Sequence, residues 1–144
     1  MKIQIKRIDK SLPLPQYQTD GSVAFDLYSR VDMIIEPKTL DFIPTNFIIK
    51  IPVGFMLSIT PRSSTPRKKG LLSPHGVGII DQDYHGEEDE IKLMLYNYTD
   101  DKVDIKKGER IGQAYFVPIE KVNFEEVEKM NENNRGGFGS TGTY

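Results

Sequence analysis

Short apolar runs, separated by turn-forming residues, are the dominant pattern of this 144-residue chain. It contains 16 Ile but only two Ala, Ala24 and Ala114, while 12 Gly and 9 Pro interrupt the apolar runs at short intervals. β-Branched residues pack well on a pleated sheet, and frequent Gly and Pro prevent long helices. The chain is therefore predicted to be all-β, as a sandwich, barrel or jelly roll.

Two segments interrupt the predicted series of strands. Residues 63–70 are expected to form one short helix, with Ser63 as its cap, Pro66 in its first turn and Gly70 at its end. Residues 121–131 are ambiguous between a strand and a helical turn. The expected strands are 2–8, 23–28, 33–36, 41–51, 54–60, 77–80, 90–99, 103–105 and 111–118.

Length and composition exclude several classes of protein. A chain of this length fits a single domain, here a β core over residues 1–130 and a C-terminal arm over 131–144. A net charge of −2 disfavours a nucleic-acid partner, and no apolar run is long enough for a membrane span. With no Cys, thiolate catalysis and Cys-ligated zinc are excluded. We expect a cytoplasmic protein, or one of the host cytoplasm if the gene is viral.

The arm is rich in Gly and carries only Phe138 and Tyr144 as large apolar side chains. By itself it cannot bury enough surface to offset its ordering entropy, so we expect it to be mobile. Gly137, Gly139 and Gly142 spell a dinucleotide-binding fingerprint, but too few residues follow for the helix that this fold requires. Its amide groups, hydroxyls and arginine could instead wrap phosphates.

Three further segments carry polar groups that suit a phosphorylated ligand. Arg62 and Ser63 lie where a predicted strand ends and a predicted helix begins, a position at which backbone N–H groups can bind an anion. A surface turn with a capped helix is the alternative interpretation. Gln113 lies among apolar neighbours and needs a partner if buried, unless it lies on an edge strand. Asp81 and Tyr84 follow an apolar strand, where a carboxylate can deprotonate a water, although an acidic solvated hairpin is the commoner case.

Taken together, five segments resemble the five ordered motifs of the homotrimeric dUTP diphosphatases (dUTPases). They stand in the family's order and with family-like spacing. The segments are 24–29 (AFDLYS), 61–64 (PRSS), 78–87 (GIIDQDYHGE), 108–113 (GERIGQ) and 135–142 (RGGFGSTG).

The resemblance implies a jelly-roll-like distorted β-barrel that assembles as a homotrimer. Its three active sites would lie at subunit interfaces, each closed by the arm of another chain. The implied reaction is the hydrolysis of dUTP to dUMP and pyrophosphate, which limits uracil in DNA and supplies dUMP. The implied cofactor is Mg²⁺, held mainly by the triphosphate.

The resemblance also implies a role for individual residues. Asp81 would activate the water that attacks the α-phosphorus, and Tyr84 would pack against the deoxyribose, where a 2′-hydroxyl would clash. Phe138 would cover the uracil, and Asp26 would contact Mg²⁺ through a water molecule. The other implied substrate contacts are Arg62, Ser63, Ser64, Gly78, Ile80, Gln113, Arg135, Gly137, Ser140 and Thr141.

Two other functions fit parts of the same pattern: that of a dCTP deaminase or a bifunctional relative, and that of a non-enzymatic binding protein. The dCTP deaminases share the fold and the Arg62-Ser63-Ser64 segment, but Met94 stands where they carry a catalytic Glu. Without that carboxylate, deamination lacks its proton shuttle. A non-enzymatic binding member of the fold is disfavoured because the implied catalytic groups are present. Asn133 occupies the position of the family's usual arm arginine, and Arg135 lies closer to Phe138.

Overall fold

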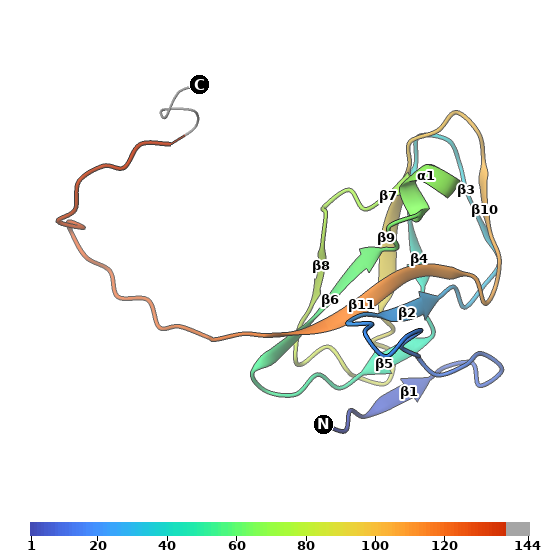
Figure 1. Cartoon of the computed structure of the whole chain (residues 1–144), viewed down its shortest axis with the longest axis horizontal. Helices are drawn as coiled ribbons and strands as arrows, with labels where there is room; N and C mark the ends of the chain where they lie inside the picture. Colours follow the sequence, from blue (N-terminus) through green and yellow to red (C-terminus); the bar gives the residue numbers. More distant parts are fainter. Residues whose placement is uncertain (138–144) are drawn as a thin grey trace.

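Four antiparallel sheets form the body of the computed structural model, which describes residues 1–137 (Figure 1). The described residues contain eleven strands and one short helix, which confirms the predicted all-β, jelly-roll-like class, although the strands do not close into a complete barrel there. The elements are β1 Ile5–Arg7, β2 Phe25–Tyr28, β3 Met33–Ile35, β4 Leu40–Pro44, β5 Phe47–Ile49, β6 Phe55–Pro61, α1 Thr65–Lys69, β7 Leu71–Leu72, β8 Gly78–Ile80, β9 Lys92–Asn97, β10 Val103–Ile105 and β11 Arg110–Pro118.

The largest sheet has the strand order β2-β11-β6-β8. Strand β11 lies between β2 and β6, so the interpretation of Gln113 as an edge-strand residue is wrong. Leu57 and Ile59 of this sheet are buried together with Leu93 of β9 in one core. The packing is close: a Cβ added to Gly112 would lie 2.6 Å from Leu93 Cδ2. A glycine on β11 therefore permits the contact between β11 and β9.

The single strand expected over 41–51 is divided into β4 and β5. Between them, Asn46 has a φ of 76°, a left-handed conformation that takes the backbone out of the strand. The Thr45 hydroxyl donates to the carbonyl of Ile91, and the Asn46 side chain bonds to the backbone of Asp9. These tertiary hydrogen bonds stabilise a break that the apolar pattern does not indicate. Strand β7 was also not predicted.

Helix α1 follows most of its predicted signals. Pro66 lies in the first turn, and Gly70 ends the helix with a φ of 66°, its N–H donating to the Pro66 carbonyl at 2.9 Å. The prediction of Ser63 as the cap is wrong, because Ser64 occupies that position and its side chain makes no capping hydrogen bond. Among the described residues, no helix is long and apolar enough to span a membrane.

Beyond β11, the chain runs away from the sheets (Figure 1). The ambiguous segment 121–131 forms neither strand nor helix. Its apolar side chains are unprotected, with Phe124 96% exposed and Val122 61% exposed. Exposed apolar side chains in this number normally pack against another protein surface, and the sheets of the same chain do not cover them.

Candidate active site

A buried carboxylate with two arginines lies at one end of the largest sheet. Asp26 of β2 is 6% exposed. Its Oδ1 lies 3.1 Å from Nε of Arg62, which directly follows β6, and its Oδ2 accepts a hydrogen bond of 3.1 Å from Nη1 of Arg110 on β11. One carboxylate neutralises only one of the two guanidinium groups. Because both arginines are partly exposed, the arrangement presents a positive charge to solvent.

Gln113 lies beside this carboxylate in the sheet, opposite Asp26 on one side and Thr60 on the other. Its amide Nε2 donates to the Thr60 hydroxyl at 3.3 Å and to the Pro61 carbonyl at 3.4 Å. Gln113 therefore finds its hydrogen-bond partners at the end of β6, as expected for a polar side chain among apolar neighbours. We refer to Asp26, Arg62, Arg110 and Gln113 as the Asp26 cluster. Arg110 was assigned no role from the sequence, although it lies inside the 108–113 motif.

The remaining predicted residues of this region adjoin the cluster. Ser63 is exposed and directly follows Arg62, while Ser64 is half-buried at the start of α1. Tyr28, the neighbour of Arg110 in the β2–β11 ladder, is buried, and this burial together with the charge of Asp26 raises the pKa of its hydroxyl above 10.0. The protonated phenol therefore adds no negative charge beside the two arginines.

Asp81 occupies the turn after β8, where its side chain is exposed. The turn is closed by the Tyr84 N–H, which donates to the Asp81 carbonyl at 3.3 Å. Gln82 attaches it to β6 by donating to the Phe55 carbonyl at 2.9 Å. Asp81 lines a cavity of about 370 Å³ together with Phe55 and Lys121. Gly78 and Ile80, both predicted substrate contacts, lie on β8 itself, with Gly78 buried against Ile59.

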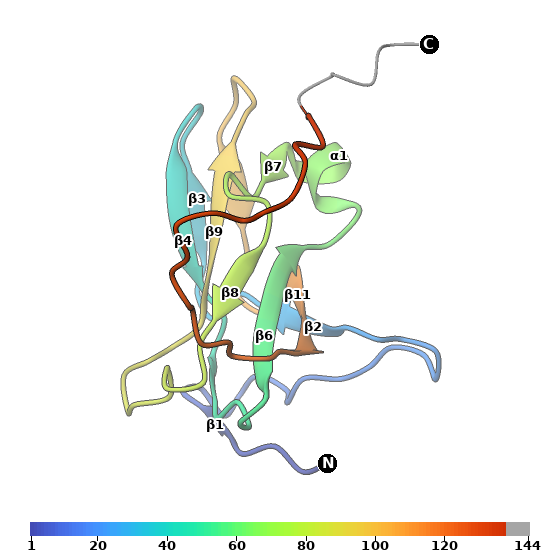
Figure 2. The same ribbon diagram turned by 90° about the vertical axis from the view of Figure 1, so that its left-hand side faces the viewer.

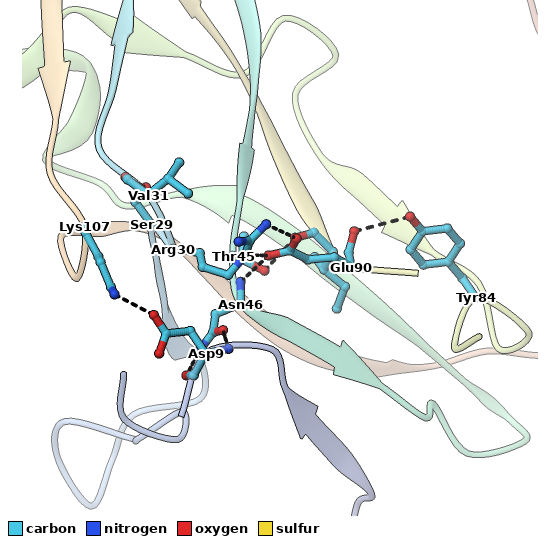
Figure 3. Close-up of polar contacts among 10 residues, drawn as sticks. Asp9, Ser29, Arg30, Val31, Thr45, Asn46, Tyr84, Glu90 and Lys107 are labelled. Carbon is cyan, nitrogen blue, oxygen red and sulfur yellow. Dashed lines mark hydrogen bonds and ion pairs between the residues drawn. The ribbon is translucent and has the colours of Figure 1, made fainter. Parts of the chain in front are cut away.

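Tyr84 lies on the same hairpin as Asp81 and is 39% exposed. Its hydroxyl donates to the carbonyl of Glu90 at 3.3 Å (Figure 3). One edge of the ring is thus attached to the protein while the ring remains accessible. A ring held in this way can serve as a platform for a ligand beside Asp81.

The structure does not bring Asp81 and the Asp26 cluster together within one chain. Ile80 pairs with Leu57, so Asp81 lies beside Met56, while Arg62 follows the opposite end of β6. At about 3.3 Å per strand residue, the distance from Met56 to Arg62 is roughly 20 Å. Figure 2 shows the same relationship, since β8 points away from α1, which follows Arg62.

The predicted arm residues lie apart from both groups. Arg135 and Gly137 are exposed in the segment that runs away from the sheets. Phe138, Ser140 and Thr141, as well as the rest of the Gly-x-Gly-x-x-Gly pattern, lie outside the described residues.

Side chains that could bind a metal ion are dispersed over the described part of the chain. Residues 1–137 contain no group of three or more acidic or histidine side chains that could hold a metal ion by themselves. Asp26 already contacts two guanidinium groups, which leaves it poorly suited to bind a metal directly. This donor set fits a metal ion whose ligands come mainly from a bound phosphate chain.

Comparison with known proteins gives one consistent result. The family model described as dUTPase matches residues 10–142. The deoxyuridine 5′-triphosphate nucleotidohydrolase of Nautilia profundicola is 40% identical, covering 99% of both chains, and that of a Hydrogenobaculum species is 39% identical, also covering 99% of both. The crystal structure of dUTPase from Streptococcus mutans superposes with a TM-score of 0.76 at 30% identity, covering 83% of this chain and 98% of that one. A mutant dUTPase of Staphylococcus bacteriophage 80alpha with dUpNHpp shares the fold, with a TM-score of 0.85 at 24% identity, covering 98% of both chains.

Proposed function

Because this chain belongs to the dUTPase family, we propose that it hydrolyses dUTP to dUMP and pyrophosphate. The observation that carries the proposal is the Asp26 cluster, in which one buried carboxylate holds two partly exposed guanidinium groups. Such a site suits a polyphosphate, and the neighbouring Ser63 and Gln113 add donors of the kind that phosphate oxygens accept. The reaction would remove dUTP from the cytoplasmic nucleotide pool, limiting uracil in DNA.

In this proposal, Asp81 activates the attacking water. The water oxygen forms a bond to the α-phosphorus, and the bond from that phosphorus to the bridging oxygen breaks. Pyrophosphate leaves with the electron pair, and the proton of the water passes to the Asp81 carboxylate and then to solvent. The exposed position of Asp81 in a turn that is closed by hydrogen bonds supports this role.

The Asp26 cluster would bind the phosphates. Arg62 and Arg110 neutralise the charge that develops on the leaving pyrophosphate, while Asp26 holds both guanidinium groups in place before the substrate arrives. Bound Mg²⁺ would supply further neutralisation of the triphosphate, and Asp26 would contact it through a water molecule. Ser63, Ser64 and Gln113 complete the set of phosphate contacts.

A complete site in this proposal requires more than one copy of the chain. A nucleotide that contacts Asp81 and the Asp26 cluster of the same subunit would have to span roughly 20 Å along β6. We therefore propose the homotrimer, in which the hairpin of one subunit faces the cluster of another. The exposed Val122 and Phe124 support an assembly in which a neighbouring copy covers the segment after β11.

The arm would close the site from a further subunit. Arg135, Ser140 and Thr141 would contact the terminal phosphates, Gly137 would let the backbone approach them, and Phe138 would cover the uracil. The backbone of β8 at Gly78 and Ile80 would border the base. An arm that orders only around bound substrate excludes water from the reaction.

A product assay tests the proposed reaction. The full-length protein is incubated with Mg²⁺ and either dUTP or dCTP, and the nucleotides and pyrophosphate are resolved. Formation of dUMP and pyrophosphate from dUTP is the expected result. Formation of dUTP from dCTP would indicate a deaminase, and no product from either substrate would indicate a binding protein. Both of these outcomes would refute the proposal.

The assembly has a separate test. Light scattering of the full-length protein should give a mass near three times 16.4 kDa. A monomer that hydrolyses dUTP would contradict the shared site while leaving the reaction intact. Activity and assembly are thus decided by independent measurements.

A further inference from the structure

An ion pair between a buried glutamate and a partly exposed arginine lies behind the hairpin that carries Asp81 and Tyr84. The Glu90 side chain is 7% exposed, and the guanidinium of Arg30 binds it through two parallel hydrogen bonds, Nε to Oε1 at 2.8 Å and Nη2 to Oε2 at 2.9 Å (Figure 3). A bidentate pair of this kind restrains orientation as well as distance. Arg30 is itself anchored, because its N–H donates to the Pro44 carbonyl at 2.9 Å.

Asn46 supplies a third donor to the same carboxylate. Its backbone N–H donates to Glu90 Oε1 at 2.8 Å, and the residue is fully buried with a φ of 76°. The unusual backbone is held from the other side, since the Asn46 amide donates to the Asp9 carbonyl at 3.0 Å. Glu90 is therefore attached to the β2–β3 connection through Arg30 and to the β4–β5 break through Asn46.

The network of Arg30, Asn46 and Glu90 contacts the Tyr84 ring through one hydrogen bond. The carbonyl of Glu90, whose side chain is so firmly held, accepts the Tyr84 hydroxyl at 3.3 Å. Gln82 attaches the start of the hairpin to β6 through the Phe55 carbonyl. An attachment of its tip, the ion pair between Lys6 and Glu87, is solvent-exposed and so contributes little. Through this hydrogen bond, the orientation of the Tyr84 ring depends on the position of the Glu90 backbone, which Arg30 and Asn46 restrain.

Stability alone does not account for the pair. Desolvating a carboxylate and a guanidinium offsets most of their attraction, and well-packed apolar residues often replace such a pair without loss of stability. What apolar residues cannot reproduce is a directional restraint on the Glu90 backbone. We propose that Arg30, Glu90 and Asn46 are positioning residues that hold the Tyr84 ring in the orientation that rejects ribonucleotides. The proposal rests on the proposed function, in which this ring packs against the deoxyribose.

The test compares kcat/KM for dUTP with kcat/KM for UTP. In Tyr84→Phe the ring remains but its bond to Glu90 is lost, and in Glu90→Gln the charged acceptor of Arg30 is lost. We expect the dUTP/UTP ratio to fall about fivefold in each, the change that corresponds to the net contribution of one hydrogen bond. The double variant should show no further fall, because both changes release the same ring.

A matched control separates positioning from stability. Lys102→Gln removes a different ion pair, that between Lys102 and Glu36, and neither residue contacts Arg30, Asn46, Glu90 or Tyr84. Its ratio should equal that of the unaltered protein. Thermal midpoints are recorded for every variant. A lower midpoint of Glu90→Gln with an unchanged ratio would mean a purely structural role and would overturn the proposal.

Two more outcomes are decisive. If the losses in Tyr84→Phe and Glu90→Gln multiply in the double variant, the two residues act independently and the inference is wrong. Should Glu90→Gln fail to fold, Arg30→Lys replaces it, since lysine keeps the charge but loses the bidentate geometry, with the same expected fall. Failure of the unaltered protein to hydrolyse dUTP would refute the proposed function instead, so the two failures are distinguishable.

Discussion

Arg62 Nε lies 3.1 Å from Asp26 Oδ1, although β2 and β6, the strands that position these residues, are not neighbours in the sheet. Strand β11 lies between them and contributes Arg110 to the other carboxylate oxygen. A long guanidinium side chain thus crosses a neighbouring strand to reach a buried acid. Asp26 therefore links β2 both to β11 and to the end of β6. One carboxylate can orient both arginines because each guanidinium binds a different carboxylate oxygen.

Replacing Asp26 should therefore disturb both arginines at once. In Asp26→Asn, two guanidinium groups lose their charged partner, and we expect kcat/KM for dUTP to fall about 10- to 100-fold, the range for hydrogen bonds to charged groups. The Mg²⁺ concentration needed for half-maximal rate should rise, as measured by pyrophosphate release over a Mg²⁺ titration. Asp104→Asn, at an exposed residue paired with Lys106, is the control. An unchanged Mg²⁺ requirement would contradict the proposed contact.

Asp81→Asn should leave the fold intact and reduce turnover by several powers of ten, because an amide cannot accept the proton of the attacking water. The side chain is exposed, so circular dichroism and the thermal midpoint should not change. Asp83→Asn, two residues along the same turn, is the matched control and should retain its rate. Near-normal turnover of Asp81→Asn would remove this residue from the mechanism.

Deleting residues 131–144 should separate activity from stability. The described part of this arm, residues 131–137, is exposed and lies outside the sheets, so the thermal midpoint without ligand should stay the same. Hydrolysis of dUTP should nearly disappear, because the arm is proposed to act in the closed complex. A truncated protein with an unchanged rate would rule out the arm as a lid.

The stability of the protein should depend on Asp9 at low pH. The pKa of this carboxyl is lowered well below its ordinary value of 3.8, chiefly by the hydrogen bond from Lys107 and then by those from Ser11. A carboxyl with a depressed folded-state pKa contributes stability that is present above the unfolded value and lost as the pH falls below it. Urea midpoints should therefore decline below about pH 4, and Lys107→Gln should make that decline shallower. An identical decline in the variant would contradict this assignment.

Asn46→Ala should be strongly destabilising. The substitution removes the side-chain hydrogen bonds with Asp9 and keeps a β-carbon in the left-handed region, so we expect the free energy of unfolding to fall by about 2–4 kcal/mol. Asn46→Gly relieves the backbone strain and should lose less. Urea denaturation at one fixed protein concentration measures both, since an oligomer's stability depends on concentration. Equal losses in the two variants would show that φ does not contribute.

Features that depend on neighbouring residues were predictable from the sequence. The apolar runs between Gly and Pro correspond to most of the observed strands, and the observed helix has Pro66 in its first turn and Gly70 at its end. The order of the five motifs also identified the family that the comparisons confirm. These predictions succeeded because strand-forming runs, helix ends and motif spacing are properties of contiguous residues.

Three features that the sequence did not predict share a different cause. The division of 41–51 at Asn46, the pairing of Arg110 with Asp26 and the burial of Glu90 against Arg30 all join residues from distant parts of the chain. Neither a local pattern nor a composition reports which distant donor will reach a given carboxylate. Strand order and register decide this, and they emerge only when the sheets assemble.

The sequence by itself thus determined an all-β domain, its turns and its family, because each of these follows from short-range chemistry. Tertiary structure alone decided that Asp26 binds two arginines and that the Tyr84 hydroxyl bonds to the backbone of Glu90, whose side chain pairs with Arg30. It also decided that Asp81 lies at the opposite end of β6 from the arginines. The reason is geometric: antiparallel pairing sends the end of β8 and the end of β6 in opposite directions, whatever side chains those ends carry.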